Sequence, residues 1–185
     1  WPKSSSARWE MSLAASDATI TIRLGSMDDY DAVLALMDDA VVWLVSQERT
    51  GQWGSDPMSG TETRRAHFRK EIETNDLWIA EIDCQPVGAM LLGDHAMSYV
   101  DAVDKPELYL HLLVTSSAHR GSGIGRALVD KAITEARDKG VTLIRVDCYA
   151  GDDQKLVAQY ERLGFTRVAP FKVGEWLGML LDMRV

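Results

Sequence analysis

The sequence has no long apolar run. No stretch reaches the roughly 20 consecutive apolar residues that cross a membrane, and no signal-peptide pattern is visible. Cysteine is also scarce: Cys84 and Cys148 show no C-x-x-C spacing, and we expect both inside strands as buried, reduced thiols. His67 and His95 show no metal-ligand spacing with a cysteine or a carboxylate cluster, so we predict no metal. These absences favour a cytoplasmic protein without a membrane partner.

Positive charge is also in short supply. The 20 Lys and Arg residues are outnumbered by 28 Asp and Glu residues, which gives a net charge of −8. Because no basic stripe is present to replace the counterions of a phosphate backbone, nucleic-acid binding is disfavoured, whereas a cationic or amine substrate is compatible. The 185 residues, 46% of them hydrophobic and 26% charged, suffice for one globular α/β domain.

The most informative stretch is His119-Arg120-Gly121-Ser122-Gly123-Ile124-Gly125-Arg126. An apolar run, 107–114, precedes it and is typical of a buried strand, and apolar residues at helical spacing follow it as far as Gly140. A strand, a glycine turn and a helix in this order form an anion site, since the first N–H groups of the helix have no partner within it. We therefore predict that residues 119–126 bind a pyrophosphate, and we call this loop and helix start the cradle. The alternative is a glycine-rich turn that binds no ligand.

The spacing of the glycines excludes two known kinds of phosphate-binding loop. No Lys follows the last glycine, which excludes the phosphate loop of nucleotide hydrolases, and the dinucleotide fingerprint G-x-G-x-x-G/A fails in both possible registers. What remains is R-x-x-G-x-G, formed by Arg120, Gly123 and Gly125. This motif resembles that of the GNAT superfamily of N-acetyltransferases, whose members hold the pyrophosphate of acetyl-CoA with it.

Periodicity predicts the rest of the architecture. Strands are expected at 19–24, 77–83, 87–92, 107–114, 142–148, 165–168 and 176–182, and helices at 26–49, 61–74, 124–139 and 152–163. The resemblance implies this order, β-α-α-β-β-β-α-β-α-β-β, which is that of the GNAT-like acyl-CoA N-acyltransferase fold. We therefore expect an α/β fold with a mixed sheet, formed by a single domain, 19–185. Residues 1–18 are expected to be an N-terminal extension or an artificial remnant preceding the domain, with Met11 as a possible natural start.

The resemblance also implies site residues. Tyr160, followed by Glu-Arg-Leu-Gly-Phe, matches the family tyrosine whose hydroxyl protonates the departing CoA thiolate; a core tyrosine is the alternative. Asp153 stands where the family often has a cofactor-contacting Asn, and it also suits a helix N-cap. The backbone of Leu112, Leu113 and Val114 is expected to bind the pantetheine arm. Further cofactor contacts are expected from the loop residues, namely His119, Arg120, Gly121, Ser122, Gly123, Ile124, Gly125 and Arg126.

The attacking amine must lose a proton, and family members use a Glu or His on or near the central strand. Glu107 is our first candidate for this base and His111 the second, because both share one strand face with Tyr109. The sequence thus predicts direct acetyl transfer from acetyl-CoA to a primary amine, small or protein-borne, with a homodimer left open. The alternative is a non-catalytic CoA-binding sensor or scaffold on the same fold. The loops 51–60 and 93–106 are expected to shape the acceptor site.

Overall fold

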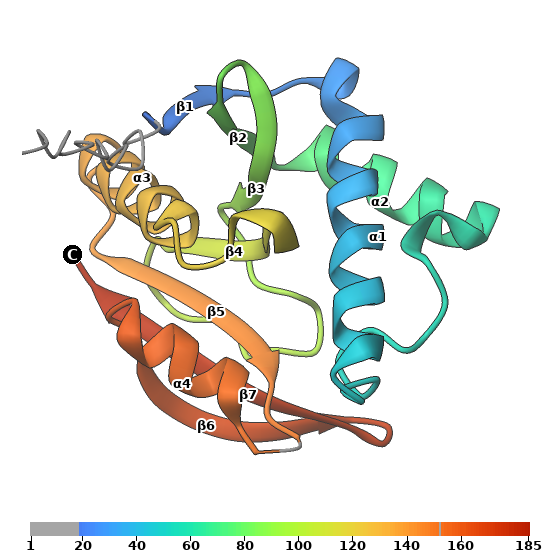
Figure 1. The fold of residues 1–185 in the computed structure, drawn as a ribbon. Coiled ribbons are helices and arrows are strands. Elements are labelled where there is room, and N and C mark those ends of the chain that lie inside the picture. The colour runs from blue at the N-terminus through green and yellow to red at the C-terminus, as the bar shows by residue number, and fades with distance from the viewer. Residues whose placement is uncertain (1–18, 152) are drawn as a thin grey trace, which may run out of the picture.

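The protein folds around one mixed β-sheet, as the computed structural model of residues 19–151 and 153–185 shows (Figure 1). The strands lie in the order β1-β2-β3-β4-β5-β7-β6. Their bounds are β1 Thr21–Leu24, β2 Asp76–Ile82, β3 Gln85–Gly93, β4 Leu108–Thr115, β5 Leu143–Tyr149, β6 Thr166–Val173 and β7 Trp176–Arg184. The element order is the predicted one, while the N-terminal extension predicted for 1–18 lies outside the described residues.

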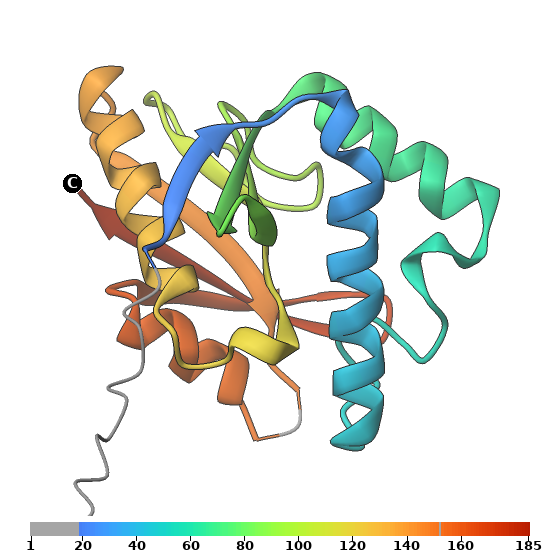
Figure 2. The same ribbon diagram turned by 45° about the horizontal axis from the view of Figure 1, so that its top comes forward.

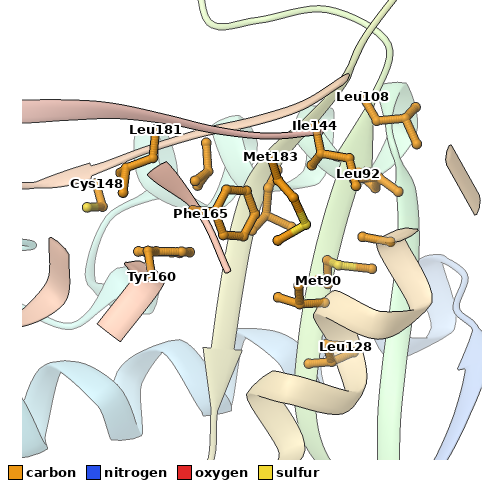
Figure 3. Close-up of a cluster of buried hydrophobic side chains, with 14 of the residues drawn as sticks. Met90, Leu92, Leu108, Leu128, Ile144, Cys148, Tyr160, Phe165, Leu181 and Met183 are labelled. Atoms are coloured by element: carbon orange, nitrogen blue, oxygen red, sulfur yellow. The ribbon is translucent and has the colours of Figure 1, made fainter. Parts of the chain in front are cut away.

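Two pairs of helices cover the two faces of the sheet (Figure 2). The helices α1 (Tyr30–Ser46) and α2 (Glu62–Thr74) share a core cluster with β2, β3 and β4, to which they contribute residues such as Val33 and Phe68. On the opposite face, α3 (Ile124–Asp138) and α4 (Lys155–Arg162) pack through Leu128, Val157 and Tyr160 into the larger cluster shown in Figure 3. No helix in the described part of the chain is both long and apolar enough to span a bilayer.

Local sequence signals account for the start of two helical segments. Ser26 caps a short 3₁₀ turn before α1, and its amide donates back to the Asp29 carboxylate at 2.9 Å, which completes a capping box. Thr61 caps α2 through its side-chain oxygen. The helix α4 begins at Lys155, three residues later than predicted, and β6 continues to Val173, five residues beyond its predicted end.

The prediction that Cys84 lies buried inside a strand was wrong. Cys84 is exposed in the turn between β2 and β3, whereas Cys148 is buried in β5 as expected. Asp83 and Cys84 have φ angles of 51° and 60°, the left-handed values that a two-residue hairpin turn needs. The strand ranges predicted from periodicity, 77–83 and 87–92, left Cys84 between the two strands, so only the expectation of a buried thiol inside a strand was wrong.

The sheet opens between β4 and β5. These parallel strands pair only at Leu108↔Ile144, Tyr109↔Arg145 and Leu110↔Val146, whereas β4 continues to Thr115 and β5 to Tyr149. Beyond Leu110, β4 stays paired with β3, and β5 stays paired with β7. The backbone edge of β4 from His111 onward therefore has no strand partner on the β5 side, and the two strands diverge (Figure 1).

We expect the replacement Leu128→Ala to lower the free energy of unfolding by about 3 kcal/mol, because it leaves a cavity under a side chain with 0% exposure. Leu24→Ala is the matched control: its side chain is 59% exposed, and its loss is expected to cost less than about 0.5 kcal/mol. Urea denaturation of the three proteins measures both values, and similar losses for the two variants would contradict this packing.

Candidate functional site

The predicted anion cradle is formed at the start of α3. Gly121 and Gly123 have φ angles of +78° and +86°, which side-chain-bearing residues rarely adopt, and Gly123 is the N-cap of the helix. A Cβ placed on Gly121, Gly123 or Gly125 would meet no atom within 4 Å, so the backbone here borders open space. The first turn holds no acidic residue. Its free amides and the helix dipole can therefore receive an anion.

A pocket of about 310 Å³ extends from these amides between α3 and α4. It is lined by most of the residues predicted to bind the cofactor and by α4 side chains, including Leu113, His119, Arg120, Gly121, Gly123, Ile124, Gly125, Arg126, Gln159 and Tyr160. The His119 Nδ1 atom is buried without a hydrogen-bond partner among the described residues, as expected where a ligand supplies the missing bond.

Ser122 and Asp153 are among the predicted contacts that lie outside this pocket. The Ser122 hydroxyl donates to the His119 carbonyl at 2.6 Å, which stabilises the loop. Asp153 is exposed, accepts a hydrogen bond from the Lys155 amide at 3.1 Å and forms an ion pair with the Lys155 side chain. Asp153 thus binds the first residue of α4 from just outside the helix, whereas the N-cap itself is Gln154 and not Asp153.

The two arginines of the cradle are held differently. The Arg120 guanidinium lies over the Trp43 ring of α1, 3.7 Å from its centroid, a cation–π contact that the sequence spacing did not reveal. Arg126 forms an ion pair with Asp130 at 3.2 Å and donates to the Leu163 carbonyl at 3.3 Å. Both side chains line the pocket, where they can add charge-assisted hydrogen bonds to a bound anion.

The pocket leads to the open edge of β4 and to a second cavity of about 180 Å³. Leu113 and Tyr160 line both, and Leu112 lines the second, whereas Val114 is a buried core residue. Unpaired N–H and C=O groups beyond Leu110 can bind the amides of an extended ligand, as a sheet edge binds an added strand. A diphosphate carrying a long amide-containing arm fits this combination.

Tyr160 lies where the two cavities meet. Its ring packs at 87° against Phe165, with centroids 5.7 Å apart, within the cluster of Figure 3. Its hydroxyl forms no hydrogen bond with any described residue. Burial, with further contributions from Cys148 and Asp147, raises the pKa of Tyr160 well above its ordinary value, so the phenol keeps its proton. Tyr160 is thus a protonated donor in the cavity.

Glu107, the first candidate for the base, lies away from the open edge of β4. Its carboxylate forms a buried bidentate ion pair with Arg145, with oxygen–nitrogen distances of 2.5 and 2.8 Å, and it does not line either cavity. Because both oxygens are bound by a permanently charged guanidinium, Glu107 is placed to hold β4 against β5 and not to accept a proton.

His111, the second candidate, lines the cavity of about 180 Å³. Its Nε2 lies 2.9 Å from the His95 carbonyl oxygen, so this nitrogen carries a hydrogen, and Nδ1 lies 3.5 Å from the Glu71 carboxylate. Burial lowers the pKa of His111, which favours the neutral imidazole.

A residue that sequence reasoning missed is Asp147 of β5. It lines the cavity together with Tyr160, and its carboxylate accepts hydrogen bonds from Tyr109 at 2.5 Å and Tyr99 at 3.2 Å. Burial raises the pKa of Asp147 above its ordinary value, although the two phenols oppose this shift. Alternation along β5 places Asp147 on the face of Arg145, but nothing in the sequence shows that Tyr99 and Tyr109 meet it.

The chain is similar in sequence to known acetyltransferases. The family model described as the acetyltransferase (GNAT) family matches residues 39–165. A mycothiol acetyltransferase from Beutenbergia cavernae is 32% identical over 132 residues, which cover 69% of this chain but 41% of that protein. One from Propionibacterium freudenreichii is 35% identical over 80 residues, 43% of this chain and 25% of that protein. The chain thus spans less than half the length of these curated relatives.

Solved structures share the fold. A GNAT-family acetyltransferase from Listeria monocytogenes superimposes with a TM-score of 0.71 at 23% identity, covering 94% of this chain and 99% of the other. A Salmonella typhimurium protein described as an acetyltransferase, solved with its cofactor acetyl-CoA, gives a TM-score of 0.61 at 21% identity and covers 89% of this chain and 93% of its own. At these identities the likeness establishes the architecture.

Glu107→Gln tests the structural assignment of this residue. The change leaves the buried Arg145 guanidinium without its counter-ion, and we expect a loss of about 3 kcal/mol in the free energy of unfolding, measured by chemical denaturation. Glu62→Gln is the control, because Glu62 also binds an arginine through two hydrogen bonds but is 70% exposed; its loss should change the free energy of unfolding much less than Glu107→Gln does. Equal stability of Glu107→Gln and the unmodified protein would contradict the assignment.

Proposed function

This chain belongs to the GNAT acetyltransferase family, and from that membership we propose that it transfers the acetyl group of acetyl-CoA directly to a primary amine. The observation that carries the proposal is the continuous path from the free amides of α3, along the unpaired edge of β4, to the Tyr160 hydroxyl. It offers an anion site, partners for an amide-bearing arm and a proton donor in the order in which diphosphate, pantetheine and thioester sulfur occur in acetyl-CoA.

The residues that would bind the cofactor fall into two groups. The amides of Ile124, Gly125 and Arg126 would receive the diphosphate, with Arg120 and Arg126 adding charge. The β4 backbone at Leu112 and Leu113 would bind the pantetheine arm, and the buried Nδ1 of His119 would gain the partner that it lacks.

Acetyl-CoA supplies an activated thioester carbonyl when bound. The β4 edge would donate a backbone N–H to the thioester oxygen, where negative charge develops during transfer. The cleft would hold the amine against this carbonyl, so that the reaction becomes effectively unimolecular and needs no acyl-enzyme. Tyr160 would donate its proton to the departing sulfur, a role that suits a phenol whose raised pKa keeps it protonated.

The replacement Tyr160→Phe tests the proton donor. It removes one oxygen and keeps the ring that packs against Phe165, so we expect the fold and the Kd for acetyl-CoA to change little. The turnover number should fall about 100-fold, the lower range for loss of a general acid. Free CoA release with a thiol reagent measures turnover, and calorimetry measures binding.

Full turnover by Tyr160→Phe would remove Tyr160 from the mechanism. Saturable binding of acetyl-CoA to the unmodified protein, without acetylation of any amine, would instead favour the non-catalytic sensor or scaffold. Absence of acetyl-CoA binding would contradict the assignment of both cavities.

Arg120→Ala tests the cradle. Loss of a charge-assisted hydrogen bond to phosphate should raise the Kd for acetyl-CoA about tenfold, equivalent to about 1.4 kcal/mol. The control is Arg137→Ala, because Arg137 lies in the last turn of the same helix, away from the pocket, and its loss should leave the Kd unchanged. Equal effects of the two replacements would indicate a general charge effect in place of a specific contact.

A further inference from the structure

The cavity beyond Tyr160 has one charged centre. Asp147 is the only Asp, Glu, Lys or Arg among the described residues that line it. Aromatic rings make up much of the remaining wall, contributed by Trp53, Tyr99, Tyr149 and Trp176. A carboxylate beside aromatic faces attracts a cation, both through its charge and through cation–π contacts.

Asp147 retains hydrogen-bonding capacity for a ligand. Tyr109 donates to Oδ1 and Tyr99 to Oδ2, so each oxygen has one protein partner. A carboxylate has about four acceptor sites, and two are therefore free on a residue that lines the cavity. Burial raises the pKa of both tyrosines above the ordinary range, so they remain donors and do not compete for the ligand's proton.

An apolar pocket of about 230 Å³ adjoins this cavity and shares Trp53, Met97, His111 and Leu112 with it. Its other walls are mainly apolar and come from α1, the following loop, α2 and β3; they include Met37, Met58, Phe68 and Leu91. Arg64, His67 and Glu71 also line this pocket. The Arg64 guanidinium is bound to the Asp56 and Pro57 carbonyls at 2.9 and 3.1 Å. The Glu71 carboxylate lies 3.5 Å from His111 Nδ1 and accepts a hydrogen bond from the Asn75 side-chain amide at 3.4 Å, so both charged groups already have protein partners. The pocket suits an apolar group that has no charge of its own.

We propose that the acceptor is a primary ammonium compound with an uncharged apolar body, whose ammonium group binds Asp147 and whose body occupies the adjoining apolar pocket. This inference rests on the proposed function and specifies its acceptor. Asp147 takes one proton from the ammonium group, and the freed nitrogen pair forms the C–N bond to the thioester carbonyl carbon. The C–S bond breaks with its electron pair on sulfur, which takes the Tyr160 proton. The second proton of the nitrogen returns to the Tyr160 oxygen, and Asp147 releases its proton to water.

Three amines test the acceptor class, each assayed for kcat/KM with acetyl-CoA. 2-Phenylethylamine has the ammonium group and the apolar body, ethanolamine lacks the body, and phenylalanine adds a carboxylate to it. We expect 2-phenylethylamine to exceed both others at least about tenfold, since one buried apolar ring or one unfavourable charge is worth more than about 1.4 kcal/mol. Equal or better use of ethanolamine or phenylalanine overturns the inference.

Measurement of acetyl-CoA binding distinguishes a wrong acceptor class from a wrong proposed function. If acetyl-CoA binds but 2-phenylethylamine is not acetylated, the acceptor class is wrong while the cofactor site stands. If acetyl-CoA does not bind, the proposed function fails with it.

Asp147→Asn tests the role of the carboxylate through the pH dependence of kcat/KM. In the unmodified protein, kcat/KM should not change with pH between two limits, the pKa of Asp147 and the pKa of the amine. The lower limit is the pKa of Asp147, which burial raises above its usual range. Asparagine cannot accept the proton, so kcat/KM should rise tenfold per pH unit until the amine itself is deprotonated. Asp138→Asn, on the exposed end of α3, is the control and should keep the level profile. An unchanged profile in Asp147→Asn overturns the assignment.

A second variant guards against a folding defect in Asp147→Asn. Tyr99→Phe keeps the carboxylate but removes one hydrogen bond that favours its ionised form, so the acid limb of kcat/KM should move to higher pH. The other titratable groups facing Asp147 are Tyr109 and His111 of β4, Cys148 of β5 and Tyr160 of α4, and Tyr99→Phe leaves each of them in place. An acid limb that does not move contradicts the role of Asp147.

Discussion

The structure depends on the short parallel pairing of β4 and β5. Three residue pairs join the strands, and beyond Leu110 and Val146 each strand remains paired on its outer side only. Buried N–H and C=O groups are normally hydrogen-bonded, so an open edge inside a sheet needs a partner from elsewhere. In this fold the edge borders the two cavities. The gap between the strands therefore creates the site, and the helices supply its ends.

Two side-chain interactions join β4 and β5 beside their short backbone pairing. Arg145 of β5 binds Glu107, the residue just before β4, and two residues further along each segment Asp147 binds Tyr109. Because residues two apart share a strand face, the two interactions form parallel diagonals between the strands. The first is a closed ion pair, whereas the second leaves acceptor capacity on a carboxylate that faces the cleft. The same alternation thus yields one structural pair and one group available to a substrate.

How much of the fold and of the candidate site could be predicted depends on how far apart in the sequence the interacting residues lie. The glycine turn, the strand–helix–strand unit and Tyr160 depend on residues close in sequence, and periodicity with the family resemblance placed each of them. The ion pair of Glu107 was not foreseen because Arg145 lies 38 residues away on β5. Asp147 was missed for the same reason, since Tyr99 and Tyr109 reach it from separate segments. The contact of Arg120 with Trp43 likewise joins two elements that the sequence does not connect.

The two ends of the cleft differ in charge, although the whole chain is acidic. The pocket of about 260 Å³ beside the cradle is lined by Arg49, Arg120, Lys155 and Arg162, and Arg126 lines its neighbour; among described residues neither pocket has an acidic lining side chain. At the far side of Tyr160, Asp147 is the charged group. An anionic ligand is therefore favoured at one end and a cationic one at the other, and the net charge of −8 attracts the cation over a longer range. Under the proposed function, this division would keep the anionic cofactor and the cationic acceptor from competing for one binding site and would bring them together at the open edge of β4.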